Sequence, residues 1–392
     1  MPLTKSRFNW SRTAVVTLSL IALPTGGFAQ SPTNLQGESD QAAISADLQM
    51  IYRKTESAAS ISDYSSIYDF CRNIVGDSTR IQDDKKYART LMSWAANRRG
   101  EARSDRAGTL VREQQLSQAE ELDSLALKDF ETAVQLDPKR WRAHHNIAIL
   151  QALQKNNKAA VESFDTVIKL NPEFADAYFN RGEIYFRNNQ FESAIEDLNK
   201  AIKLKPDDSD AYSSRAHSLY AVGKNEAALA DYEKAMELSP DSCEAATEYA
   251  DTCQALGKWK EAATAYQRAM QLDGQNARTF QNAAWMMATC PDDFYRNGNS
   301  ALETAQIAVQ LSSSPSSVHV LDVLAAAQAA SGDFLSAEKT IAEALRSTTD
   351  ASLRSEMQMR GRQYQRKRPF VQPSLVSKGN AANKTSSATK RN

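Results

Sequence analysis

The chain has 392 residues, of which 42% are hydrophobic, and its formal net charge is −1 at pH 7. With only 14 Gly and 11 Pro, this composition is typical of a folded helical protein and excludes general disorder. The charge is uneven, because ten basic residues and a single acid, Glu356, stand from Ala351 onward, which leaves the preceding part acidic. An acidic body repels phosphate, so we expect no nucleic-acid partner.

The N-terminal stretch 1–29 has the parts of an export signal. Three basic residues precede an apolar core over residues 14–23, and Gly27-Phe28-Ala29 places small residues where a signal peptidase reads them. This core is too short to span a bilayer comfortably, which takes about 20 residues. We therefore expect a signal peptide over residues 1–29 and a periplasmic or secreted protein. An uncleaved N-terminal membrane anchor is the alternative.

A leader and a divergent helical region follow. Residues 30–46 are polar and lack an apolar period, which predicts a flexible leader. Apolar residues then recur at helical spacing, and residues 47–106 are predicted to form divergent helices that cap the N-terminal end of a repeat array. The last of these helices should run from about Ile81 to Arg106. Within it, the segment from Asn97 to Glu101 looks like a stretched version of Asn180-Arg181-Gly182-Glu183.

A strict 34-residue register begins next. Proline recurs with this spacing, and it ends a helix because its ring disfavours helix in the preceding residue. The repeated positions are Pro138, Pro172, Pro206 and Pro240, with Gly274 in the next place. Counting back gives second-helix packing residues Ala126/Phe130/Ala133, Ala160/Phe164/Val167, Ala194/Leu198/Ala201, Ala228/Tyr232/Ala235 and Ala262/Tyr266/Ala269. First helices should begin at Trp141, Ala175, Ser209, Cys243 and Ala277.

Aromatic, small, Ala, aromatic, Ala and Pro positions at fixed offsets within each period resemble the tetratricopeptide repeat, a helix–turn–helix unit. The resemblance implies an all-α right-handed superhelix (α-solenoid) of about six to seven repeats with capping helices. We expect the array over residues 107–346, a C-terminal capping helix over 347–371 and a disordered basic tail over 372–392. An insertion follows Cys290-Pro291-Asp292-Asp293, and the second helix of that unit should restart near Asn299. The segment from Ala284 to Asp292 is similar to exported bacterial tetratricopeptide proteins of unassigned role.

No pattern of catalytic or metal-ligating residues stands out. The sequence has no Gly-rich phosphate loop, no Gly-x-Ser-x-Gly turn and no Cys-x-x-Cys pair. His144 and His145 diverge by about 100° on a helix and so cannot chelate one metal ion. We predict a non-enzyme with no cofactor, no metal and no small-molecule substrate. Cys243 and Cys253 lie about 15 Å apart by helical rise, so we expect no disulfide framework and a buried thiol at Cys253.

The resemblance also implies where a partner binds, because the concave groove of such arrays is lined by the first helices. In family members that grip peptides, Asn at the places of Asn146 and Asn180 bonds the peptide backbone. Asp210 and Ser214 stand where capture of a C-terminal carboxylate needs basic side chains, which disfavours that mode. We expect His144 to pack in the core and His145 to face the groove. The candidate groove residues are Arg142, His145, Asn146, Phe179, Asn180, Glu183, Arg187, His217, Tyr220, Asp251 and Asn282.

These residues grade from basic and aromatic to acidic, which would suit an extended peptide with both charge signs. We therefore expect a non-catalytic scaffold or adaptor, exported from the cytoplasm, that binds a protein or peptide partner. The alternatives are a targeting subunit of a cell-envelope enzyme complex and a self-associating structural protein. A further alternative is that Asn146 and Asn180 are simply consensus residues. The basic tail could make weak contact with anionic surfaces.

Overall fold

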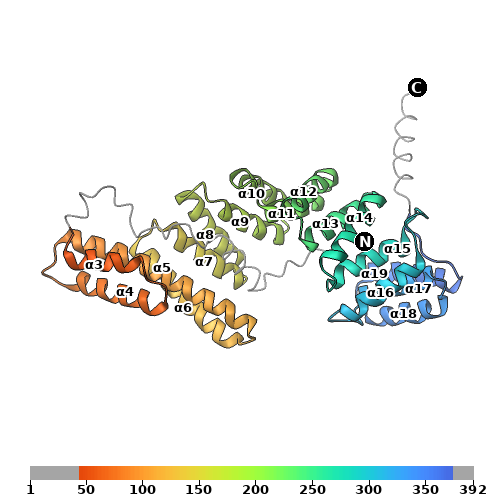
Figure 1. Cartoon of the computed structure of the whole chain (residues 1–392), viewed down its shortest axis with the longest axis horizontal. Helices are drawn as coiled ribbons and strands as arrows, with labels where there is room; N and C mark the ends of the chain where they lie inside the picture. The colour runs from red at the N-terminus through yellow and green to blue at the C-terminus, as the bar shows by residue number, and fades with distance from the viewer. Residues whose placement is uncertain (1–43, 374–392) are drawn as a thin grey trace, which may run out of the picture. The chain divides into compact units, whose positions relative to one another are not determined.

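A computed structural model describes residues 44–373. The predicted signal peptide, nearly all of the predicted leader and the tail beyond residue 373 lie outside the described residues. Within that range the chain forms seventeen α-helices and no strand (Figure 1). Along the same stretch, no helix combines the length and the apolar character that a membrane span needs. The fold is an all-α solenoid.

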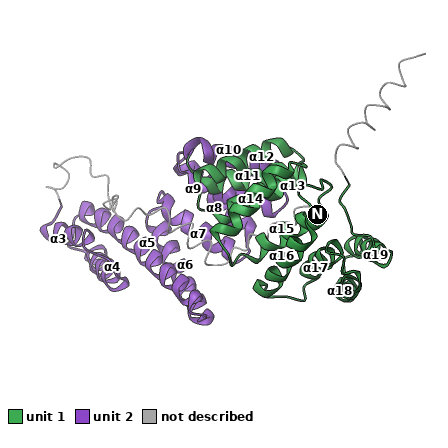
Figure 2. Ribbon diagram, turned by 45° about the vertical axis from the view of Figure 1, so that its right-hand side comes forward, with its two compact units in different colours: residues 1–4, 207–392 green, residues 5–206 purple. Residues whose placement is uncertain are grey.

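The chain divides into two compact units at Pro206, and each is described by itself (Figure 2). The N-terminal unit contains α3 (Ala46–Thr55), α4 (Ile61–Gly76), α5 (Gln82–Arg112), α6 (Leu116–Leu136), α7 (Trp141–Leu153), α8 (Asn157–Leu170), α9 (Ala175–Arg187) and α10 (Phe191–Leu204). The C-terminal unit contains α11 (Ser209–Ala221), α12 (Asn225–Leu238), α13 (Cys243–Ala255), α14 (Trp259–Leu272), α15 (Ala277–Thr289), α16 (Gly298–Leu311), α17 (Val318–Ala330), α18 (Phe334–Ser347) and α19 (Ala351–Gln365).

The repeat register is confirmed by the helix starts. The first helices α7, α9, α11, α13 and α15 begin at the five predicted residues. The second helices carry the predicted packing residues inward, since Ala160, Phe164 and Val167 on α8 are fully buried and their counterparts on the other second helices are buried too. A small Ala lets two helices approach closely, and the aromatic ring one turn later fills the space behind it.

Three ion pairs mark the same crossing point of the two helices of a repeat. Arg181 binds Asp197 and Arg215 binds Asp231, each through two hydrogen bonds of 2.7 Å and each across 16 residues. Arg99 on α5 binds Asp129 on α6 in the same way, but across 30 residues. The hairpin of α5 and α6 is therefore longer than that of a standard repeat by 14 residues, the difference between 30 and 16. Because no proline interrupts it, α5 continues to Arg112, so the expected boundary at residue 106 falls inside this helix.

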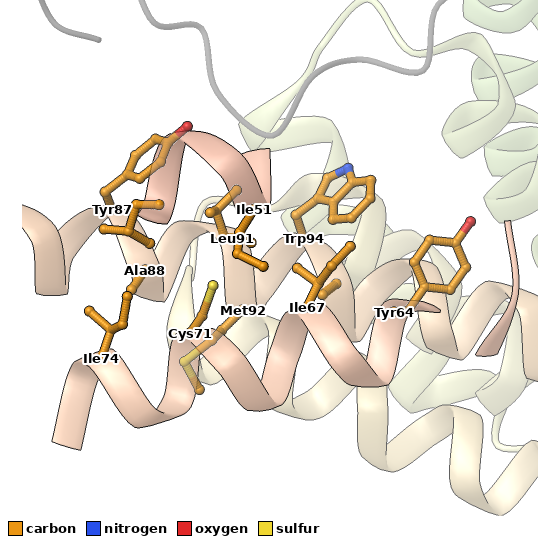
Figure 3. Close-up of a cluster of buried hydrophobic side chains, with 12 residues drawn as sticks. Ile51, Tyr64, Ile67, Cys71, Ile74, Tyr87, Ala88, Leu91, Met92 and Trp94 are labelled. Carbon is orange, nitrogen blue, oxygen red and sulfur yellow. The ribbon is translucent and has the colours of Figure 1, made fainter. Parts of the chain in front are cut away.

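The N-terminal unit begins with its own apolar core. Ile51 of α3, Tyr64 and Ile67 of α4, and Leu91 and Trp94 of α5 are buried against one another (Figure 3). The Tyr64 and Trp94 rings meet edge to face at 5.7 Å, a favourable geometry for aromatic pairs. This core joins α3 and α4 to α5.

At the C-terminal end, the chain turns back after α19. The insertion that follows Cys290 is present, and α16 begins at Gly298. Beyond Gln365 the chain passes through Lys367, whose φ of 52° lies in the left-handed region, and reaches α15. There the Gln372 backbone N–H donates to the Thr289 carbonyl at 2.8 Å. We call residues 366–373 the C-terminal strap.

Candidate functional site

Asn146 on α7 is already bonded within the N-terminal unit. Its Nδ2 donates to Asn97 Oδ1 at 3.4 Å and to Glu101 Oε1 at 3.3 Å. Glu101 also accepts hydrogen bonds from Asn97 at 2.8 Å and from Arg98 at 2.5 Å. The Asn146 amide therefore connects two neighbouring first helices, α5 and α7. Its N–H groups already have hydrogen-bond acceptors within the protein.

Arg142, one turn before Asn146, is placed differently. Its side chain is exposed and its guanidinium carbon lies 4.4 Å from the centre of the Trp141 ring. Desolvation lowers the pKa of Arg142, Glu101 opposes that shift, and the positive charge of Arg98 adds to it. Among residues 44–373, no carboxylate forms an ion pair with Arg142. The guanidinium is thus held over a flat ring with its hydrogen-bond donors available.

His145 is a core residue rather than a groove residue. Its ring makes edge contacts with Phe164 at 5.7 Å and Phe174 at 5.0 Å, and it is 9% exposed. Burial lowers the pKa of His145 to about 4. His144 is half-buried, with Nε2 3.1 Å from the Pro138 carbonyl oxygen. His145 is therefore the more buried of the two histidines, because the turn of about 100° between them sends it inward.

The α9 members of the predicted set are largely buried. Asn180 donates to the Asp176 carbonyl at 2.8 Å, and its Nδ2 lies 3.5 Å from His145 Nε2. Phe179 is 9% exposed and Glu183 is 5% exposed. Arg187 is half-buried, and desolvation lowers its pKa to about 10 against the opposing attraction of Glu183. Only a small part of this surface is available to a partner.

In the C-terminal unit, His217 on α11 faces Glu248 on α13. The two side chains lie 3.2 Å apart, from Nε2 to Oε1, and both are nearly enclosed. Burial works to raise the pKa of Glu248, but attraction to His217 and the hydrogen bond between them outweigh it and leave the pKa lowered. Tyr220 is half-buried, and its pKa is raised by burial and by nearby Asp251.

Asp251 is a buried carboxylate at the junction of three helices. It accepts hydrogen bonds from Tyr266 Oη of α14 at 2.6 Å, from Arg278 Nη2 of α15 at 2.8 Å and from Asn282 Nδ2 of α15 at 2.8 Å. Desolvation nevertheless leaves its pKa raised. The Asn282 amide and the Asp251 carboxylate are thus hydrogen-bonded to each other within the protein. The exposed Arg278 is the part of this group that a partner could reach.

The predicted site residues therefore form two groups, one in each unit. Most of them connect successive first helices to one another. Thr247 and Thr279 add a further hydrogen bond of this kind, 2.7 Å long, between α13 and α15. Such contacts fix the packing of one repeat against the next, because a buried polar group must find a partner inside the protein.

Arg98 and Glu101 of α5, which lie beside α7, are not among the predicted site residues. The likeness of their segment to residues 180–183 is the signal in the sequence that points to them. The Arg–Asp pair is also a repeated feature that was not predicted, although Arg181 and Arg215 stand one period apart and so do Asp197 and Asp231. Within the described part of the chain, no group of three His, Cys, Asp or Glu side chains is arranged to hold a metal ion. All four cysteines fall in that part and are free thiols.

Family models match the middle of the chain. Two that are described as tetratricopeptide repeat match residues 175–208 and 214–277, and one described as TPR repeat matches residues 152–189. No curated protein sequence matches the chain.

Solved structures that resemble the chain do so at low identity. PilF from Pseudomonas aeruginosa is 19% identical over 58% of this chain and 96% of that one, with a TM-score of 0.47. Yeast Tom70 is 15% identical over 90% of this chain and 69% of that one, with a TM-score of 0.43. YrrB, described as a TPR protein with an unusual peptide-binding site, is 21% identical over 49% of this chain and 95% of that one, with a TM-score of 0.41.

Tetratricopeptide repeat proteins are generally non-catalytic scaffolds that bind protein or peptide partners. The 34-residue register, the helix pairs that it produces and the matches to three family models together show that this chain belongs to the tetratricopeptide repeat family.

Proposed function

We propose that this protein is an exported, non-catalytic adaptor that binds an extended segment of a partner protein on the first-helix face of its N-terminal unit. We define that face by Arg98 and Glu101 of α5 and by Arg142 and Asn146 of α7. The export part of the proposal rests on the charged, apolar and small-residue regions of residues 1–29. Fractionation of cells that express the full chain tests it, and recovery of the whole protein in the cytoplasm would contradict it.

The observation that carries the binding proposal is the state of Arg142. Its neighbours Asn146, Asn97 and Arg98 all donate hydrogen bonds to Glu101, whereas Arg142 is exposed, lacks an ion pair within residues 44–373 and has a lowered pKa. A lowered arginine pKa means that the surroundings under-compensate its charge. A carboxylate from a partner would supply that compensation and accept two parallel hydrogen bonds from the planar guanidinium.

The adjoining groups suggest how the rest of such a segment would lie. The ring pair Trp141 and Phe174, with centres 4.5 Å apart, offers apolar area beside Arg142. Glu101 on the other helix is already paired with Arg98 at 2.5 Å, so the face as a whole is basic. The face is therefore complementary to a short segment that carries an acidic residue next to an apolar one.

The test is a cross-linked pull-down from the cell envelope with residues 30–392 as bait. The bait is compared with Arg142→Ala and with the matched control Lys169→Ala, which removes an exposed basic side chain from the second helix α8. Asn146 and Asn180 are left intact, because their amides hold neighbouring structural elements and their loss would perturb the unit. We expect one partner to be retained by the unchanged bait and by Lys169→Ala and lost with Arg142→Ala.

Equal retention by all three baits would show that this face is not the binding site. An enzyme among the specifically retained proteins would identify the chain as a targeting subunit, and recovery of only a second copy of the chain would favour self-association. All three baits are purified in the same way. Their circular dichroism is compared before the pull-down, so that a difference in folding is not mistaken for a difference in binding.

A further inference from the structure

The C-terminal strap lies against the first helices of the last repeats. After α19 ends at Gln365, the strap returns to α15, which belongs to an earlier repeat. Phe370 is its only large side chain that packs inward, and it contacts apolar residues of two core clusters of the C-terminal unit. Arg366, Lys367, Arg368, Pro369 and Pro373 are exposed. The strap is thus an extended segment held by one ring.

Phe370 occupies a place lined by Trp285 and Arg360, which we call the Phe370 pocket. Its ring centre lies 6.0 Å from the centre of the Trp285 ring. The Arg360 guanidinium lies over both rings, at 5.5 Å from Trp285 and 5.6 Å from Phe370. Asp322 on α17 fixes that guanidinium through hydrogen bonds of 3.1 Å and 2.7 Å. An aromatic residue in this place therefore contacts both the Trp285 ring and an oriented cation, which also contact each other.

The strap does not satisfy this pocket completely. Trp285 is 4% exposed, and its Nε1–H has no hydrogen-bond partner among residues 44–373. A buried N–H without an acceptor costs free energy, and such groups are rare unless something absent from the structure completes them. The strap thus leaves the indole N–H of Trp285, the ring against which Phe370 packs, without an acceptor among residues 44–373.

The strap also makes few contacts with the helices beneath it. Besides the Phe370 ring, the Gln372 N–H to the Thr289 carbonyl is its one hydrogen bond to α15 within the described residues, and Val371 is 37% exposed. Backbone pairing plus one side chain in a pocket is how an extended peptide binds a protein surface. The two prolines, Pro369 and Pro373, favour the extended conformation that this requires.

We propose that the pocket formed by Trp285, Asp322 and Arg360 is a second peptide-binding site, with Phe370 as its resident occupant. Its ligand is an extended partner segment that carries an aromatic side chain and a hydrogen-bond acceptor for Trp285. Such a segment displaces the strap, which competes at the high effective concentration of a tethered ligand. This site lies in the C-terminal unit and does not depend on the function proposed for Arg142.

The test measures binding of a fluorescein-labelled peptide with the strap's own sequence, Arg-Lys-Arg-Pro-Phe-Val-Gln-Pro. The proteins are the chain from residue 30 to 392, its Phe370→Ala variant and a matched control, Leu335→Ala, which removes another apolar side chain from the surface of the same unit. We expect Phe370→Ala to bind the peptide at least tenfold more tightly than the unchanged chain and Leu335→Ala. The peptide with Ala in place of Phe should not bind.

Equal binding to all three proteins, or no binding to a folded Phe370→Ala variant, would overturn the proposal. A dimer of the unchanged chain that Phe370→Ala abolishes would also overturn it, because the strap would then belong on a second copy. If Phe370→Ala does not fold, hydrogen exchange of the unchanged chain decides. The Gln372 amide should exchange at least 100-fold faster than the central amides of α19, and equal protection would make the strap a fixed part of the fold.

Discussion

Arg360 donates two hydrogen bonds to Asp322, and both residues are almost completely buried, at 3% and 0% exposure. The pKa of Asp322 is nevertheless raised, because desolvation of the carboxylate outweighs the attraction of Arg360. The pair thus replaces hydration only in part, as is common for buried ion pairs. Removing one member of the pair should therefore lower stability, whereas replacing both members with apolar residues should not.

We predict that Asp322→Ala lowers the free energy of unfolding of the C-terminal unit by about 3–5 kcal/mol, because it leaves the buried guanidinium with only the exposed Glu356, 3.5 Å away, as a counter-charge among the described residues. The double variant Asp322→Leu/Arg360→Met should be within about 1 kcal/mol of the unchanged chain or more stable than it. Glu237→Ala, which breaks the exposed pair with Lys234, is the matched control and should change little. Hydrogen exchange in α17 and α19 measures all three. Equal losses in the free energy of unfolding for the single and the double variant would contradict this explanation.

A second prediction concerns acid stability. The pKa of buried His145 is lowered to about 4, whereas in an unfolded chain it is about 6.5, so the unfolded state binds the proton more readily. The N-terminal unit should therefore lose stability as the pH falls from about 6.5 to about 4, by an amount on the order of 3 kcal/mol. His145→Phe should remove that part of the pH dependence. Urea unfolding at several pH values measures it, and an unchanged slope in His145→Phe would refute the assignment.

The third prediction concerns the close crossing of α5 and α6. A Cβ at Gly100 would lie 2.6–2.9 Å from three atoms of the buried Phe130 ring. We expect Gly100→Ala to destabilise the N-terminal unit by about 1–3 kcal/mol, despite the better helix propensity of Ala. Gly76 ends α4, and a Cβ added there would meet nothing within 4 Å, so Gly76→Ala should be neutral or slightly stabilising. Thermal unfolding of both variants makes the comparison. A stabilised Gly100→Ala would show that the two helices can separate freely.

The fourth prediction concerns the hydrogen bonds at Asp251. Tyr266→Phe removes an O–H that donates to Asp251 at 2.6 Å and lies 2.9 Å from Gln254 Oε1. We expect a loss of about 1–3 kcal/mol, because a buried carboxylate loses one of its three donors. Tyr212→Phe, which deletes the hydroxyl of a half-buried tyrosine of the same unit, should change stability by less than about 0.5 kcal/mol. Equal losses in the two variants would mean that Asp251 gains nothing from Tyr266.

The regular part of the fold could be predicted from the sequence because its determinants repeat. Proline or glycine at every thirty-fourth position, together with a small Ala and a large side chain one turn later, marks each second helix, so the starts of α7 through α15 followed directly. The long first hairpin could not be placed by counting, because Gly100 and Phe130 stand much further apart in the sequence than Gly182 and Leu198, which meet at the same crossing point. The contact between Gly100 and Phe130 shows that they are equivalent to that pair.

The binding surface was less predictable than the helices. Register shows which residues face the first-helix side, but it does not show which of them are already bonded to one another. Asn146 finds Glu101 at a separation of 45 residues, outside the 34-residue period. His145 is drawn into the core by Phe164 and Phe174, which belong to later parts of the chain. The strap gives no periodic signal at all, so the meeting of Phe370 with Trp285 appears only in three dimensions.

The extended hairpin of α5 and α6 has a practical consequence. Its extra length adds about seven residues, or about 10 Å, to each helix. Beyond the crossing at Gly100, the two helices pack through a small cluster of Ala107, Leu110 and Ala119. The turn at Gln114 that joins them, with φ of 60°, is exposed. A fluorophore or affinity tag inserted at this exposed turn would report on the protein in its cell without altering the packing of α5 and α6 at Gly100.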